Sequence, residues 1–231
     1  MRRRTLLVSL PLSLGLGLLG GCSALEGATP PDEALETART TFVDAGTVGF
    51  ALKHSAIPQG HNGVSAATGS GVVDEQTPKF RGQVTGVING NSAGVEIIAI
   101  DDKTWMSFFT KDFNPVNMKD LNAPNPAEFF RTGSGVDSIL ASTTDLKEGK
   151  GVRDGDTVLQ EYTGTVPAAE IQRLFGLGAS ETEFAVTYGI EPESGQLRTA
   201  TITGNFYEVK ETTFSLDITD YGKDVTITAP R

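Results

Sequence analysis

The sequence has little of the residue chemistry that catalytic and metal sites need. One cysteine and two histidines among 231 residues allow no internal disulfide and make a structural zinc site implausible. No Gly-x-Ser-x-Gly elbow places a serine on a strand–turn–helix unit. The pairs Gly69-Ser70-Gly71 and Gly133-Ser134-Gly135 lack the dinucleotide fingerprint and the phosphate-loop lysine. We therefore predict no enzyme, no catalytic residues, no metal and no cofactor.

Positive charge is also scarce. The 19 basic residues are outnumbered by 29 acidic ones, which gives a net charge of −10. Because no basic stripe is left to neutralise phosphates, nucleic acid is excluded as a partner. His54 and His61 stand in no catalytic or zinc-binding motif, so we expect surface or hydrogen-bonding roles for both. The composition, 38% hydrophobic, still suffices for a folded core.

The N-terminus carries an export signal. Three arginines precede an uncharged stretch, Leu6 to Leu19, which is too short to span a bilayer as a helix but has the length of a secretory h-region. Leu19-Gly20-Gly21-Cys22 follows and resembles the bacterial lipobox. The resemblance implies a signal peptide over residues 1–21 and acylation of Cys22. Two or three acyl chains would anchor the protein stably on the outer face of the cytoplasmic membrane.

Beyond Cys22 the sequence predicts a short tether and one domain. Residues 22–31 have no periodicity and read as a flexible tether, and the folded unit is expected over residues 32–231, with Asp32 capping a first helix. From residue 48 onward the apolar period changes from about 3.6 to about 2, which indicates strands. Asn89-Gly90 is the pair preferred in a type I′ hairpin. Strands interrupted by two or three amphipathic helices predict an α+β fold with an antiparallel sheet covered on one side.

Glycines within the predicted strands do not decide whether the interior is empty or filled. Such glycines often mark curvature or the close approach of another group. They are compatible with a curved sheet that encloses an apolar space and equally with a bent but filled sandwich.

The lipobox, the order of a helix followed by strands, and the ending Asp220-Tyr221-Gly222-Lys223-Asp224-Val225-Thr226-Ile227 resemble the LppX/LprA/LprF/LprG family of actinobacterial envelope lipoproteins. The resemblance covers residues 34–230 and rests on a general layout plus that tail. It implies a strongly curved antiparallel half-barrel with helices on its concave side, enclosing an apolar cavity and similar to Lol carriers. It also implies binding of acylated lipids or glycolipids and no catalytic residues.

On this basis we expect a membrane-anchored lipoprotein that carries acylated lipids or glycolipids across the periplasm-like space toward the outer envelope. Its partners would be the lipid, the outer leaflet of the cytoplasmic membrane and a lipid-exporting transporter. A ligand with two acyl chains needs a cavity of about 800–1,000 Å³. The alternative is a non-catalytic scaffold lipoprotein that docks an envelope transporter or a cell-wall enzyme. The strand and helix faces predict the following cavity lining: Leu35, Phe42, Leu52, Val84, Ile97, Trp105, Ile139, Leu140, Leu174 and Phe175.

Overall fold

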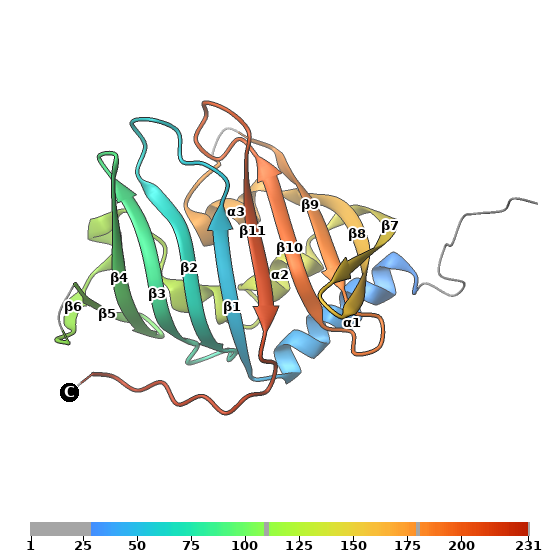
Figure 1. The fold of residues 1–231 in the computed structure, drawn as a ribbon, viewed down its shortest axis with the longest axis horizontal. Helices are drawn as coiled ribbons and strands as arrows, with labels where there is room; N and C mark the ends of the chain where they lie inside the picture. The colour runs from blue at the N-terminus through green and yellow to red at the C-terminus, as the bar shows by residue number, and fades with distance from the viewer. Residues whose placement is uncertain (1–28, 109–110, 179–180, 231) are drawn as a thin grey trace, which may run out of the picture.

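The protein forms one large antiparallel sheet with a thin helical layer on one side. The computed structural model describes residues 29–108, 111–178 and 181–230. In these residues the strands run in the order β6-β5-β4-β3-β2-β1-β11-β10-β9-β8-β7, with every neighbouring pair antiparallel. The two ends of the sheet do not meet, so it is an open half-barrel, as predicted (Figure 1).

The strands are β1 (Thr47–His54), β2 (Gly63–Val72), β3 (Lys79–Ile88), β4 (Asn91–Ile100), β5 (Lys103–Ser107), β6 (Asn114–Val116), β7 (Thr144–Asp154), β8 (Thr157–Pro167), β9 (Glu183–Ile190), β10 (Leu197–Gly204) and β11 (Thr212–Thr219). The helices are α1 (Pro31–Asp44), α2 (Val136–Ala141) and α3 (Ala168–Phe175), together with the 3-10 helices η1 (Met118–Leu121) and η2 (Pro126–Phe130).

Local sequence explains the turns that shape this sheet. Asn89 and Gly90 both have positive φ, 51° and 77°, which confirms the predicted tight hairpin between β3 and β4. Gly69 and Gly82 face each other across β2 and β3, and a Cβ on Gly82 would lie 2.1 Å from the carbonyl oxygen of Thr68. The two strands therefore approach more closely here than side chains would allow.

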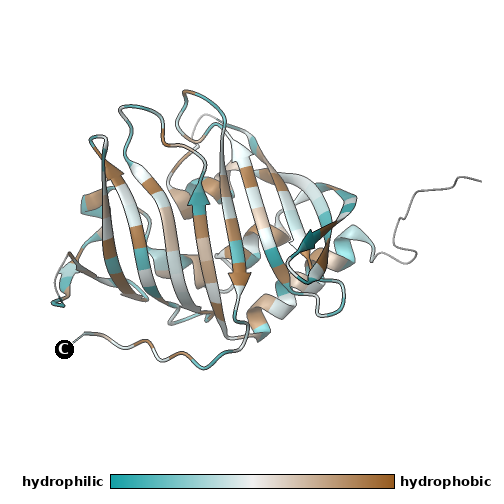
Figure 2. Cartoon of the chain, viewed as in Figure 1, coloured by the Kyte–Doolittle hydropathy of each residue, from teal (hydrophilic) through white to brown (hydrophobic). Residues whose placement is uncertain are grey.

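The helices lie behind the sheet in the view of Figure 1 and enclose the main hydrophobic core against it. Apolar residues alternate with polar ones along most strands, as the brown and teal bands of Figure 2 show. The buried residues of this core come from α1, α2, α3, η2 and nine of the eleven strands, so the chain from residue 22 onward contains all of them.

Several predicted boundaries were wrong. Helix α1 begins at Pro31, with Pro30 at the N-cap position, so Asp32 lies in the first turn instead of capping it. The helical spacing of Val136, Ile139, Leu140 and Thr143 predicts a helix that ends near Leu146, but α2 ends at Ala141. The residues from Thr144 onward form strand β7, which was missed. Cys22 lies outside the described residues.

Candidate functional site

An apolar cavity lies between the middle of the sheet and the helices. Its volume is about 40 Å³. Tyr188 contributes its ring, while its hydroxyl is 2.8 Å from the Thr143 hydroxyl, within hydrogen-bond distance. All other wall residues are fully apolar. The wall consists of Phe42, Val48, Phe50, Leu52, Phe129, Phe130, Val136, Ile139, Leu140, Phe175, Tyr188, Leu197, Ala200, Ile202, Phe214, Leu216 and Ile218.

Strand alternation builds the sheet side of this wall. Val48, Phe50 and Leu52 of β1 lie two residues apart and so point to the same face of the sheet. The adjacent strand β11 supplies a matching row, in which Leu216 pairs with Leu52 and Ile218 with Phe50. The two paired strands therefore form a continuous apolar floor under the helices.

The cavity separates the helical side of the wall from the sheet. Helix α2 supplies Val136, Ile139 and Leu140, yet its backbone lies closest to α1 and α3. Only side chains bridge the space between α2 and the β1–β11 floor. Moving α2 outward would therefore enlarge the cavity without breaking backbone hydrogen bonds of the sheet.

The volume corrects the sequence-based expectation of about 800–1,000 Å³. By this measure a water molecule needs roughly 10–15 Å³, so 40 Å³ holds about three waters. The aromatic rings of Phe50, Phe129, Phe130, Phe175 and Phe214 fill much of the rest of the interior. This conformation is thus closed, and an acyl chain enters only if the helices or these rings move.

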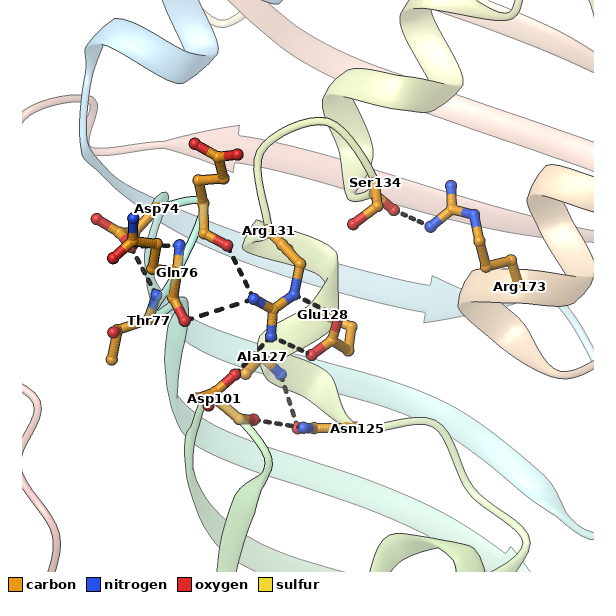
Figure 3. Close-up of polar contacts among 11 residues, drawn as sticks. Asp74, Gln76, Thr77, Asp101, Asn125, Ala127, Glu128, Arg131, Ser134 and Arg173 are labelled. Carbon is orange, nitrogen blue, oxygen red and sulfur yellow. Dashed lines mark hydrogen bonds and ion pairs between the residues drawn. The ribbon is translucent and has the colours of Figure 1, made fainter.

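Two arginines hold the helical layer in the closed position. Arg131, directly after η2, bonds Asp101 and Glu128, each at 2.7 Å, and donates to the carbonyl oxygen of Glu75 at 2.8 Å (Figure 3). These hydrogen bonds raise the pKa of Arg131, so the side chain stays charged at all working pH values. It ties η2 to the β2–β3 loop and to the β4–β5 turn.

The second arginine joins α2 to α3. Arg173 on α3 donates to the Ser134 carbonyl oxygen and to the Ser138 hydroxyl at 2.7 Å, and it pairs with Glu170. Figure 3 shows it reaching from its helix to the turn that precedes α2. We call Arg173, Ser134, Ser138 and Glu170 the α2–α3 latch.

Five of the ten predicted lining residues border the cavity: Phe42, Leu52, Ile139, Leu140 and Phe175. Leu35, Ile97 and Leu174 are buried in the same core away from the cavity, and Val84 packs at its margin. Trp105 differs from the prediction. Met106 points into the core, so its neighbour Trp105 lies on the outer face of β5, opposite Ile98.

The prediction missed most of the aromatic wall. Val48 and Phe50 were recognisable, because they share the inward face of β1 with Leu52. Phe129 and Phe130 lie in a five-residue 3-10 helix, for which the sequence offers no clear periodicity. Residues 90–94 match the Gly-x-Ser-x-Gly spacing, yet they run from a hairpin turn into β4 and not into a helix.

His54 lies next to the cavity wall, at the end of β1, and contacts the wall residue Phe214. It is the next inward-facing residue of β1 after Leu52, its Nε2 lies 2.9 Å from the Thr212 hydroxyl, and its ring stacks on Phe214 at 4.1 Å. Burial lowers the pKa of His54 to about 4, so the imidazole is neutral at pH 7. A hydrogen-bonding role, as predicted from the sequence, fits this placement.

Within the described ranges, no helix is long and apolar enough to cross a membrane. In that same part of the chain, no group of three or more His, Cys, Asp or Glu side chains is arranged to hold a metal ion.

An open antiparallel half-barrel closed by short helices over an apolar interior defines the structural class of this protein. A family model described as "LppX_LprAFG lipoprotein" matches residues 33–227. The chain belongs to the LppX/LprA/LprF/LprG lipoprotein family. Comparison with curated protein sequences gave no match.

Solved structures agree with this fold. LprF from Mycobacterium bovis is 12% identical, with a TM-score of 0.74 over 87% of this chain and 96% of LprF. LppX from Mycobacterium tuberculosis is 16% identical, with a TM-score of 0.56 over 86% of this chain and 100% of LppX. A LolA superfamily protein from Nitrosomonas europaea, 12% identical over 87% of this chain and 99% of its own, reaches a TM-score of 0.33, on which we base no argument.

Proposed function

We propose that this protein is a membrane-anchored, non-catalytic carrier that shelters the acyl chains of lipids or glycolipids inside its half-barrel. The observation that carries the proposal is the cavity wall, in which apolar side chains from sheet and helices converge on one enclosed space. Membership of a lipoprotein family supports the anchor, which we assign to Cys22 after removal of residues 1–21.

The energetics of lipid exchange explain why an apolar interior is useful. Two sixteen-carbon chains hold roughly 30 methylenes, and each contributes about 0.8 kcal/mol when withdrawn from water, about 24 kcal/mol in total. This gross cost opposes unaided passage through an aqueous gap. A cavity lined like the one described offers the chains an environment close to that of a bilayer, so uptake and release are nearly balanced.

Loading requires the closed interior to open. The arrangement of α2 supports this step, because its side chains and the α2–α3 latch hold it over the cavity, while the backbone hydrogen bonds of the sheet are independent of it. We propose that α2 and η2 move outward as acyl chains enter. The cavity would thereby grow toward the several hundred Å³ typical of ligand sites.

The carrier proposal also assigns a place and partners. Anchored by Cys22 on the outer leaflet of the cytoplasmic membrane, the domain would receive lipid from that leaflet or from a lipid-exporting transporter. It would then release the lipid toward the outer envelope.

A transfer assay tests the proposal. The chain from residue 22 onward, produced without its acyl anchor, is mixed with donor vesicles that contain a fluorescent diacyl lipid and with unlabelled acceptor vesicles. The proposal predicts transfer that rises in proportion to protein concentration. Transfer no faster than in buffer would contradict it.

The filled interior also favours the alternative, a scaffold lipoprotein that docks an envelope transporter or a cell-wall enzyme. A scaffold needs no internal space, and the 40 Å³ cavity is compatible with a permanently packed core. The same assay separates the two functions, because a scaffold transfers no lipid.

A further inference from the structure

Two residues with buried, unpartnered polar atoms, His54 and Tyr207, lie in contact beyond one end of the apolar cavity. Within residues 29–108, 111–178 and 181–230, five buried side-chain polar atoms have no hydrogen-bond partner. Three of them are His54 Nδ1, Tyr207 Oη and Asn205 Oδ1. His54 ends β1, and the other two residues lie in the β10–β11 connection beside it.

This group continues the cavity wall. His54 follows Val48, Phe50 and Leu52 on the inward face of β1. Its partner Thr212 precedes Phe214, Leu216 and Ile218 on the inward face of β11. The apolar floor formed by β1 and β11 therefore ends in one polar residue on each strand, His54 and Thr212. Phe214 both lines the cavity and stacks on the His54 ring.

The geometry fixes these groups in place. His54 and Tyr207 are 8% and 6% exposed, and their rings stack with centroids 5.5 Å apart. A Cβ on Gly63 would lie 2.2 Å from the Tyr207 hydroxyl, so only glycine allows that hydroxyl its position against β2. A buried polar atom without a partner costs about 1–3 kcal/mol, so this end of the interior favours a ligand that supplies hydrogen bonds.

The chemistry of the cluster selects the ligand group. The groups that contact the imidazole are the Thr212 hydroxyl and the rings of Phe206, Tyr207 and Phe214, none of which carries a charge. Burial keeps the imidazole neutral at pH 7. An anionic phosphate would find no counter-charge among these groups, whereas a hydroxyl or an ester carbonyl needs only hydrogen bonds. The other titratable side chain at the site is His61, whose ring meets the Tyr207 ring edge-on with centroids 5.5 Å apart.

We propose that His54 and Tyr207 form a binding site for the neutral polar end of an acylglycerol, whose hydroxyl or ester oxygens hydrogen-bond to them while its acyl chains fill the cavity. This proposal rests on the proposed lipid-carrier function and adds to it a preference for uncharged headgroups.

Binding measurements with three probes test the site on the chain from residue 22 onward. The probes are dipalmitoylglycerol, dipalmitoyl phosphatidate, which has the same acyl chains but a phosphate, and hexadecane, which has no polar group. We expect the parent protein to bind dipalmitoylglycerol more tightly than phosphatidate. His54→Phe and Tyr207→Phe should each weaken dipalmitoylglycerol binding about tenfold, the upper range for one net hydrogen bond, and leave hexadecane binding unchanged.

Tyr162→Phe is the matched control. It removes a tyrosine hydroxyl that donates to the Thr29 carbonyl oxygen at 3.0 Å and lies outside the cavity wall, so dipalmitoylglycerol binding should not change. Normal dipalmitoylglycerol affinity in both His54→Phe and Tyr207→Phe would overturn the proposal, as would a parent protein that prefers phosphatidate. A parent protein that binds none of the three probes would overturn the carrier function itself. Tyr207→Phe leaves no polar atom unpaired, whereas His54→Phe leaves the Thr212 hydroxyl without the imidazole. Circular dichroism therefore checks that both variants fold.

Discussion

Filling the cavity should block lipid binding without destroying the fold, and Leu140 is the position that tests this most sharply. Leu140 is 3% exposed, lies on α2 and borders the cavity. Leu140→Trp adds about six non-hydrogen atoms. If the indole excludes about four acyl methylenes from the cavity, each methylene forfeits about 0.8 kcal/mol of burial. Lipid binding then weakens by about 3 kcal/mol, or more than a hundredfold.

The structure also predicts what this substitution does to the free protein. The 40 Å³ cavity cannot take the whole indole, so Leu140→Trp should lower the free energy of unfolding by about 1–3 kcal/mol through overpacking. The opposite change, Leu140→Ala, should cost about 2–5 kcal/mol but keep lipid binding, because it adds space. Urea unfolding measures the stabilities, and titration with a fluorescent diacyl lipid measures the affinities.

Leu121→Trp is the matched control, since Leu121 is 48% exposed on η1 and away from the cavity wall. It should change neither lipid affinity nor stability appreciably. If folded Leu140→Trp binds lipid as tightly as the parent protein and the control, acyl chains do not occupy this cavity, and the reasoning fails.

Three other changes test the latch, the buried histidine and the packing of the sheet. Arg173→Ala should speed lipid release several-fold and change stability by less than about 1 kcal/mol, because exposed ion pairs contribute little. Lys223→Ala, which breaks an exposed ion pair with Asp220 after β11, should leave release unchanged in stopped-flow fluorescence. The His54 pKa falls from 6.5 unfolded to about 4 folded, so its contribution to stability is present above about pH 6.5 and is lost as the pH falls toward 4. Urea unfolding should show the parent losing up to about 2 kcal/mol more than His54→Phe between pH 7 and pH 5, and equal losses would refute the assignment. Gly71→Ala, whose Cβ would lie 2.2 Å from a ring of η2, should lower the melting temperature, whereas Gly94→Ala, with nothing within 4 Å, should not.

Local patterns predicted the architecture well, because strands and turns depend on neighbouring residues. The alternation in β1 and the Asn89-Gly90 pair led directly to observed elements. Strand β7 was missed because its sequence, rich in lysine, aspartate and glycine, belongs to an edge strand that is mostly exposed and shows no apolar alternation. Trp105 was predicted to line the cavity without any pattern that assigns faces in its strand, and its neighbour Met106, on the opposite face of β5, is the residue that points into the core.

The candidate site was harder to predict than the fold. Whether an interior is empty or filled depends on how rings from distant segments pack. Phe50 of β1 meets Phe130 only because η2 packs over the neighbouring strands β2, β3 and β4. The pair His54 and Thr212 is 158 residues apart in sequence, so no local motif announces it. The resemblance to a lipoprotein family predicted an apolar interior but not its closed state.

Native mass spectrometry tests the central claim most directly. The chain from residue 22 onward is expressed in bacterial cells, where membrane lipids are available to it, and is purified without detergent. The account predicts a population heavier than the polypeptide by the mass of one acylated lipid, which dissociates on activation to release fatty-acyl fragments. The Leu140→Trp variant should lack this population. A parent protein that shows only the bare polypeptide mass, even after incubation with diacyl lipid vesicles, would contradict the claim that its interior opens to hold acyl chains.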